Sequence, residues 1–574
     1  MEKRISRNDM FVHDMVHNNP GLARYETAYR NPLFLKKRGF DAITFDLFEC
    51  AQFGLLWDRY DIIRNDGKKV FPANSAMRKW AEAKKEELKE SYQAAADAGL
   101  KVTFMMDIIV LPLTIPQLVP EVLDENGMID IQKPEMKMVL DCMFDEIFTE
   151  FPQINGIYIR YGETYVGEKY LTPYHRGNNP VLGDRVDFHQ FLIGYLTQKV
   201  CGEYNREIYY RTWEFDDFQY DPLMYLKVSN AIPQHEKLYF CIKHTQGDFH
   251  RTFAFNQCLN IGKHKQIVEV QAAREYEGKG AFPNYIADGV INGFEEYKWL
   301  MKPDETQSLK EVVNQKDSLI QGIWTWSRGG GWDGPYLMGK NGHNGIVEIK
   351  DGRELWADLN AYVISQWAKD TSRSDRYYAE QYAEEILGMN TKEQEIFYEI
   401  CLKSAHAVLL GRGTNSPCFS FDVWWTRDQN ISYETLLKNI RSAIACNALD
   451  VLLEEKERSV IIWKEMVELA RKFSEKVEAK DYIIMTCEYG RLLFSLYEVM
   501  YRANALAILG NHKKELDMAI CQYDDLWKEW EELKRQKPGC PTLYEKKDIN
   551  LDLMGYIGNC GFDATINPLR VLLD

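Results

Sequence analysis

The feature that most constrains the fold is a regular alternation between residues 11 and 330. Short runs of β-branched and aromatic residues alternate there with longer stretches of helical periodicity, a pattern typical of parallel strands joined by crossover helices. Eight strand candidates predict a closed (β/α)8 TIM barrel, an α/β fold. The candidates are Phe11–Val16, Ala42–Glu49, Lys101–Asp107, Gly156–Tyr161, Glu207–Trp213, Leu238–Lys243, Gln266–Gln271 and Gln321–Trp326.

The strand pattern stops after about residue 355, and only helical periodicity follows. A chain of 574 residues exceeds what one hydrophobic core usually contains, so a second domain is expected. We predict a catalytic barrel over residues 1–370 and an all-α C-terminal domain over 371–574. The predicted helices are Leu355–Lys369, Ser374–Leu387, Lys392–Leu410, Tyr433–Lys456, Ser459–Ala479, Asp481–Leu509 and Lys513–Gln536.

Charge excludes two classes of partner. The net charge of −16 repels the phosphates of nucleic acids and anionic membrane surfaces, so neither is an expected partner.

The first residues lack the continuous apolar stretch of a signal peptide, and the protein is expected to be cytoplasmic. Twelve cysteines are scattered without close C-x-x-C pairs, which disfavours a zinc or redox site, and no cofactor is expected.

Acidic residues follow three of the predicted strands at their carboxyl ends, where the catalytic groups of a barrel lie. Glu163 follows the fourth strand, Asp248 the sixth and Glu275 the seventh. Hydrolysis of a glycosidic bond needs one protonated carboxyl group as acid and one ionised carboxylate as base or nucleophile. The three residues therefore predict a glycosidase site.

Four segments carry a resemblance to a known family. They read GIYIRYGE with Glu163, YYRTWEF with Arg211, KHTQGDFHR with Asp248, and VEVQAAREYEG with Glu275. In this order, and with Asp248 and Glu275 spaced 27 positions apart, the chain resembles the α-glucuronidases of glycoside hydrolase family 67 over roughly residues 155–390. Two departures are the missing α/β domain ahead of the barrel and a different loop after Glu163.

The resemblance implies roles for the acidic residues. Glu163 would be the general acid, while Asp248 and Glu275 would hold and deprotonate the water, which implies an inverting mechanism with ~6.5–9.5 Å between acid and base. Arg160 opposes this assignment, because a nearby cation favours an ionised Glu163. The implied activity is exo-acting removal of a uronic acid from short oligosaccharides, and the family also suggests a homodimer.

Substrate-binding candidates lie at the same strand ends. Binding the carboxylate of a uronic acid needs basic side chains. Basic residues at these strand ends could instead neutralise the catalytic carboxylates. Trp213 and Trp332 are candidates for stacking on a sugar ring, and His244 and Glu269 for polar contacts. The basic candidates are Arg160, Arg211, Lys243, Arg251 and Arg328.

Three alternatives stay open. The pattern of His244, Asp248 and His250, with Glu269 nearby, could bind a divalent metal and make a metal-dependent barrel enzyme, although we expect no metal. The barrel could also bind carbohydrate without turning it over. A third possibility is a glycosidase that acts on a neutral or N-acetylated sugar.

Overall fold

The structure is a computed structural model. It describes the following residues: 9–16, 27–160, 174, 185–213, 217–249, 251, 253–272, 277–278, 280–328, 355–413, 433–510, 512–537, 549–550, 559–560 and 562–573. The predicted sites at Glu163, Glu275 and Trp332 lie outside these residues, and so does His250.

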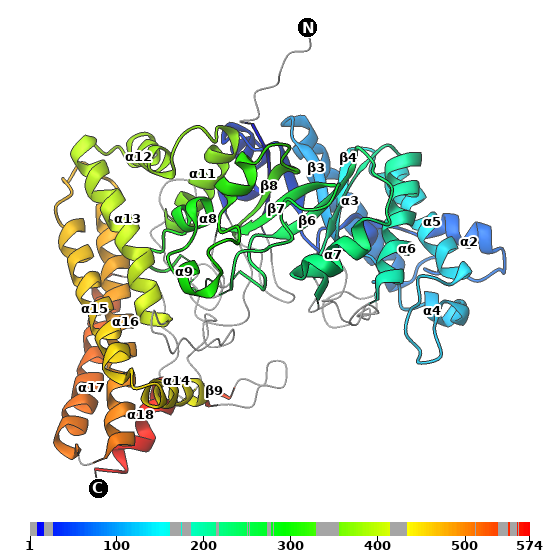
Figure 1. Cartoon of the computed structure of the whole chain (residues 1–574). Helices are drawn as coiled ribbons and strands as arrows, with labels where there is room; N and C mark the ends of the chain where they lie inside the picture. Colours follow the sequence, from blue (N-terminus) through cyan, green and yellow to red (C-terminus); the bar gives the residue numbers. More distant parts are fainter. Residues whose placement is uncertain are drawn as a thin grey trace.

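Eight parallel strands close into a barrel, which confirms the predicted fold (Figure 1). Each strand pairs with the next in the chain, and β8 closes the barrel on β1 with Trp324 beside His13. The strands are β1 (Phe11–Val16), β2 (Ala42–Phe45), β3 (Lys101–Asp107), β4 (Ile154–Arg160), β5 (Glu207–Arg211), β6 (Leu238–Lys243), β7 (Lys265–Gln271) and β8 (Ile320–Arg328).

The second strand ends earlier than predicted. We expected it to reach Glu49, but it ends at Phe45. Asp46 begins a turn there: its carboxylate accepts from the Phe48 amide at 2.9 Å, and its carbonyl accepts from the Glu49 amide at 3.0 Å. A short side chain that bonds the backbone two residues on competes with the sheet.

Helices join the strands around the outside of the barrel (Figure 1). The long helix α3 begins after Ser75, whose hydroxyl accepts from the Arg78 amide at 3.1 Å and caps the helix. The helices up to the end of the barrel are α1 (Pro32–Lys37), α2 (Asp58–Arg64), α3 (Ala76–Asp97), α4 (Ile115–Leu118), α5 (Pro134–Glu150), α6 (Val186–Leu196), α7 (Pro222–Ser229), α8 (Ala287–Asn292), α9 (Tyr297–Leu300), α10 (Leu309–Asn314) and α11 (Leu355–Lys369).

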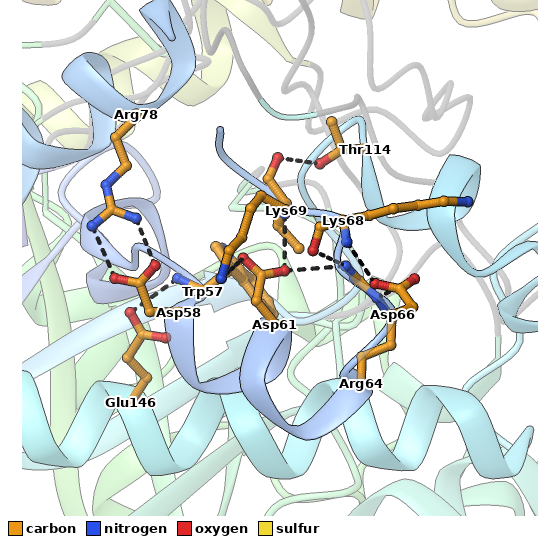
Figure 2. Close-up of polar contacts among 11 residues, drawn as sticks. Trp57, Asp58, Asp61, Arg64, Asp66, Lys68, Lys69, Arg78, Thr114 and Glu146 are labelled. Atoms are coloured by element: carbon orange, nitrogen blue, oxygen red, sulfur yellow. Dashed lines mark hydrogen bonds and ion pairs between the residues drawn. The ribbon is translucent and has the colours of Figure 1, made fainter. Parts of the chain in front are cut away.

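The long segment between β2 and α3 includes α2 and is fastened to neighbouring helices (Figure 2). Glu146 of α5 accepts the backbone amides of Leu56 and Trp57 at 2.6 and 3.1 Å. Arg78 of α3 makes two hydrogen bonds to Asp58, at 2.6 and 2.8 Å. These contacts fix this βα segment beside the first half of the barrel.

Helices form most of the rest of the described chain. Figure 1 shows α13, α15, α16 and α17 side by side, next to the barrel. Helix α16 is apolar and long enough to cross a membrane, but 67% of its apolar window is buried, as in the core helix of a domain. The helices are α12 (Asp375–Glu385), α13 (Thr391–Arg412), α14 (Tyr433–Ala445), α15 (Leu449–Ala470), α16 (Lys480–Leu509), α17 (Lys513–Gln536) and α18 (Phe562–Arg570), with a two-stranded sheet of β9 (Ile549–Asn550) and β10 (Asn559–Cys560).

Three details of the helical region differ from expectation. Helix α15 runs unbroken through residues 457–458, where we expected one helix to end and the next to begin, and it ends at Ala470, nine residues before the predicted Ala479. The helix predicted over Tyr433–Lys456 is interrupted before Leu449, because Asn447 takes a left-handed conformation with φ 54°. Asn is one of the few non-glycine residues that adopt this conformation readily. Helix α18 was not predicted. Helix α11 packs on strands β1 and β8. The boundary between the two domains, which we placed near residue 370, stays a prediction.

A buried carboxyl group links the first and last strands. Asp14 of β1 accepts hydrogen bonds from the Thr325 hydroxyl at 2.7 Å, the Ser327 hydroxyl at 2.7 Å and the Ser327 amide at 3.1 Å. Burial raises the pKa of Asp14 from 3.8 to about 7, because desolvation outweighs these hydrogen bonds. In the folded state Asp14 therefore keeps its proton up to about pH 7, whereas in the unfolded state it loses the proton near pH 3.8.

This proton makes stability depend on pH. Between pH 3.8 and 7 the folded chain binds more protons at Asp14 than the unfolded chain, so stability falls as pH rises. Acidification from pH 7.5 to 5.5 is expected to stabilise the protein by about 2 kcal/mol relative to Asp14→Asn, which does not titrate. Unfolding of both proteins at the two pH values measures this. Equal pH dependence in the two proteins would rule out the assignment.

Candidate active site

Side chains fill the interior of the barrel. Tyr158 stacks on Trp324 and on Tyr209, with ring centroids 4.1 and 4.4 Å apart. The Tyr158 hydroxyl lies 2.8 Å from Nδ1 of His13, and burial holds the pKa of His13 well below its usual value. The middle of the barrel is thus a packed core, and any site must lie at an end of the strands.

Two strand-end residues form a buried ion pair above this core. Arg160, the last residue of β4, donates from Nε and Nη2 to the two oxygens of Asp107, the last residue of β3, at 2.6 and 2.8 Å. Both side chains are almost fully buried. The charge of Arg160, three residues before Glu163 in the chain, is therefore balanced by Asp107.

A second buried pair spans the barrel from β5 to β7. Arg211 donates to the carboxylate of Glu269 at 2.9 and 2.6 Å, across the intervening strand β6. The guanidinium also lies over the rings of Trp324 and Trp326, 5.4 and 5.6 Å from their centroids. The side chains of Arg211 and Glu269 are 1% and 0% exposed, so this pair is shielded from solvent.

The third pair contains a predicted catalytic residue. Lys243, the last residue of β6, donates to Asp248 at 2.6 Å. Its ammonium lies 3.3 Å from the ring centroid of Trp213 and 4.4 Å from that of Phe249. The Asp248 side chain is 21% exposed and that of Lys243 is 5% exposed, so this carboxylate, unlike that of Glu269, is within reach of a molecule from solvent.

His244 and Arg251, which we predicted to bind substrate, both contact other groups of the protein. The His244 amide donates to the Glu269 carbonyl at 3.1 Å, and its buried ring has Nδ1 3.4 Å from the same oxygen. Arg251 makes two hydrogen bonds to Glu296, at 2.6 and 3.0 Å, and donates to the Ala405 carbonyl of α13. Arg251 thus connects the segment after β6 to the C-terminal helices.

The structure brings part of the predicted site together. Lys243 contacts both Asp248 and Trp213, and the pair of Arg211 and Glu269 lies on the neighbouring strands β5 and β7. The backbone of Arg328 ends β8, but its side chain lies outside the described part of the chain. In sequence, Glu163 follows the end of β4 and Glu275 the end of β7, which keeps them candidates for the same face of the barrel.

Four of the five predicted cations are ion-paired: Arg160, Arg211, Lys243 and Arg251 each contact a carboxylate. Sequence reasoning missed Asp107 and Phe249. Asp107 was visible as an acidic residue ending a predicted strand, and Phe249 as an aromatic next to Asp248. Among the described residues, no three His, Cys, Asp or Glu side chains form a metal-binding group.

Comparison with known proteins supports the architecture. No family model matches the sequence, and no curated protein is detectably similar to it. Among solved structures, a GH138 enzyme targeting pectin rhamnogalacturonan II is similar with a TM-score of 0.55 and 11% identity, over 99% of this chain and 67% of that one. An O-GlcNAc hydrolase mutant from Thermobaculum terrenum has a TM-score of 0.42 and 11% identity, over 99% and 95% of the two chains.

The fold comparison rests on the first of these structures, which shares the overall architecture at low identity. Neither is described as a family 67 enzyme, so the resemblance to that family stays a prediction. The chain has a (β/α)8 barrel with a helical region after it, and its overall fold is similar to that of the GH138 enzyme.

Proposed function

We propose that the protein is a glycoside hydrolase whose site lies at the carboxyl ends of β4, β6 and β7. The observation that carries the proposal is the geometry of Asp248: a partly exposed carboxylate, held at 2.6 Å by Lys243, beside the aromatic rings of Trp213 and Phe249. An adjacent ammonium stabilises the ionised carboxylate, and this is the form that accepts a proton from water.

The proposed reaction is an inverting hydrolysis. Glu163 donates a proton to the glycosidic oxygen, the bond from this oxygen to the anomeric carbon breaks, and a water attacks that carbon from the opposite face. Asp248, together with Glu275, takes the proton from the water. The pairing of Arg160 with Asp107 supports a protonated Glu163, because the cation that would favour ionisation is already balanced.

We propose a terminal uronic acid on a short oligosaccharide as the substrate, as in an α-glucuronidase. Lys243 retains donor capacity beyond its bond to Asp248, and Arg328 ends β8. A cytoplasmic location and a homodimer stay predictions. The second candidate is a neutral or N-acetylated sugar, and the ion pairing of four of the five predicted cations favours it.

A substrate panel tests the proposal. Aryl α-glucuronides and aldouronic oligosaccharides are incubated with the full chain, alongside neutral and N-acetylated aryl glycosides. We expect the enzyme to hydrolyse the substrates that carry a uronic acid and none of the neutral or N-acetylated glycosides. Turnover restricted to the neutral sugars would favour the second candidate, binding without turnover would favour a non-catalytic barrel, and activity lost with a chelator and restored by Zn²⁺ or Mn²⁺ would favour a metal enzyme.

A further inference from the structure

The segments after β6 and β7 are joined by one carboxylate. Oε1 of Glu277 accepts the backbone amide of Arg251 at 3.0 Å. Arg251 lies three residues after Asp248, and Glu277 lies two residues after Glu275. Arg251 and Glu277 are both 4% exposed, so this hydrogen bond is shielded from water and stronger than a surface contact. It joins the two chain segments that would hold the catalytic water.

The other oxygen of Glu277 is tied to the barrel. Oε2 accepts from Nδ2 of Asn284 at 3.0 Å. The carbonyl of Asn284 in turn accepts from the side chain of Asn360 on α11 at 2.9 Å, and Asn360 also accepts the Ile286 amide at 3.0 Å. The carboxylate of Glu277 therefore has a fixed position relative to the barrel wall.

The C-terminal helices hold both segments. Arg251 is fixed by Glu296 and by the Ala405 carbonyl of α13. Downstream of Glu277, the ring of Phe282 packs against Trp463 of α15 and Phe494 of α16, with centroids 5.7 and 5.4 Å apart. Neighbouring C-terminal helices thus contact both Arg251, after β6, and Phe282, after β7.

The backbone next to Glu277 is sharply turned. Gly278 has φ +86°, and the Phe282 ring lies 2.3 Å from the position that a Cβ of residue 278 would occupy. No side chain fits there without displacing Phe282 from its contact with the helices. The turn at Gly278 and the contact of Phe282 therefore belong to the same local arrangement.

We infer that Glu277 is a positioning residue, which sets the distance between the Asp248 and Glu275 segments through its bond to the Arg251 amide. This inference rests on the proposed function. Two carboxylates that share one water need a fixed separation, and a displacement of about 1 Å can cost on the order of 100-fold in rate. The C-terminal helices then form part of the catalytic unit, because they hold both ends of this connection.

The test compares two substitutions of Glu277. Glu277→Ala removes both acceptors and is expected to lower kcat roughly 10- to 100-fold, with KM within about twofold, because substrate contacts are untouched. Glu277→Gln is expected to restore kcat to within about threefold. Its amide keeps an acceptor for Arg251 and can donate to Oδ1 of Asn284 once that amide rotates, since Oδ1 has no hydrogen-bond partner among the described residues.

A matched control and a second readout separate the possible outcomes. Glu295→Gln weakens a 3.4 Å contact to the Arg251 side chain and a 2.9 Å contact to His406 of α13, but it leaves the Arg251 amide bonded to Glu277 and should leave kcat unchanged. Hydrogen exchange of the peptide containing the Arg251 amide should accelerate in Glu277→Ala and not in Glu277→Gln. This readout needs no substrate.

Faster exchange in Glu277→Ala with an unchanged kcat would overturn the inference while the proposed function stands. A reduced kcat that Gln does not restore would also overturn it, because charge rather than position would then be required. An unmodified protein that hydrolyses no glycoside would overturn the proposed function, and the positioning role with it.

Discussion

Asp248→Asn is expected to lower kcat by roughly 100- to 10,000-fold, the usual contribution of a general base. Asparagine keeps an oxygen that accepts from Lys243, so the local structure and substrate binding should survive, but it cannot take a proton from water. The measurement is kcat and KM on the best substrate of the panel, with circular dichroism to confirm folding.

The matched control is Asp141→Asn on α5. Asp141 is also paired with a lysine, Lys137 at 2.7 Å, but it lies on the outer surface of the barrel. Its substitution should leave kcat unchanged. If Asp248→Asn retained kcat within about threefold of the unmodified protein, Asp248 would not be the base and the site would need another carboxylate.

Glu269→Ala is expected to destabilise the protein by about 3–5 kcal/mol, because it leaves the guanidinium of Arg211 buried without its carboxylate. Removing one member of a buried pair costs far more than the pair contributes. The double substitution Arg211→Met with Glu269→Leu should recover most of this loss, since apolar side chains of similar volume often replace a buried pair without penalty.

Chemical denaturation of the two variants measures the effect. Asp141→Ala provides the surface comparison: it removes a partly exposed ion pair with Lys137 and a 2.9 Å hydrogen bond from Tyr195, and the loss should be only about 1–2 kcal/mol. A loss of that small size for Glu269→Ala would show that the carboxylate is not needed to balance Arg211, and that water reaches the pair.

Local sequence patterns were enough to predict the barrel and most helices. The strands are runs of β-branched and aromatic residues, and seven of the eight predicted segments differ from the observed strands by no more than two residues at either end. The errors have local causes. At Asp46 a side chain bonds the backbone and ends the strand, and at Asn447 a left-handed residue interrupts a helix.

The site was only partly predictable, because its partners are distant in sequence. Arg160 and Arg211 were identified as strand-end cations, but Asp107 and Glu269 are 53 and 58 residues away from them. Nothing in the sequence says which cations pair with protein carboxylates. That pairing depends on which side chains face each other inside the barrel, and it decides how many cations remain to bind a uronate.

The contact between the C-terminal helices and the segment after β6 could not be predicted from the sequence either. Arg251 was expected to contact substrate, because it follows a strand end together with Asp248. In the structure its guanidinium reaches Glu296 and the Ala405 carbonyl, which is 154 residues away in the chain. Its substrate-binding role stays a prediction, and we leave Arg251 out of the proposed substrate contacts.

The most direct test of the central claim is the stereochemistry of the sugar that the enzyme first releases, followed by proton NMR before mutarotation. An acid at Glu163 and a water held by Asp248 and Glu275 predict that an α-glycoside yields the β-anomer first. Initial release of the α-anomer would contradict the account, because retention requires a carboxylate that attacks the anomeric carbon itself.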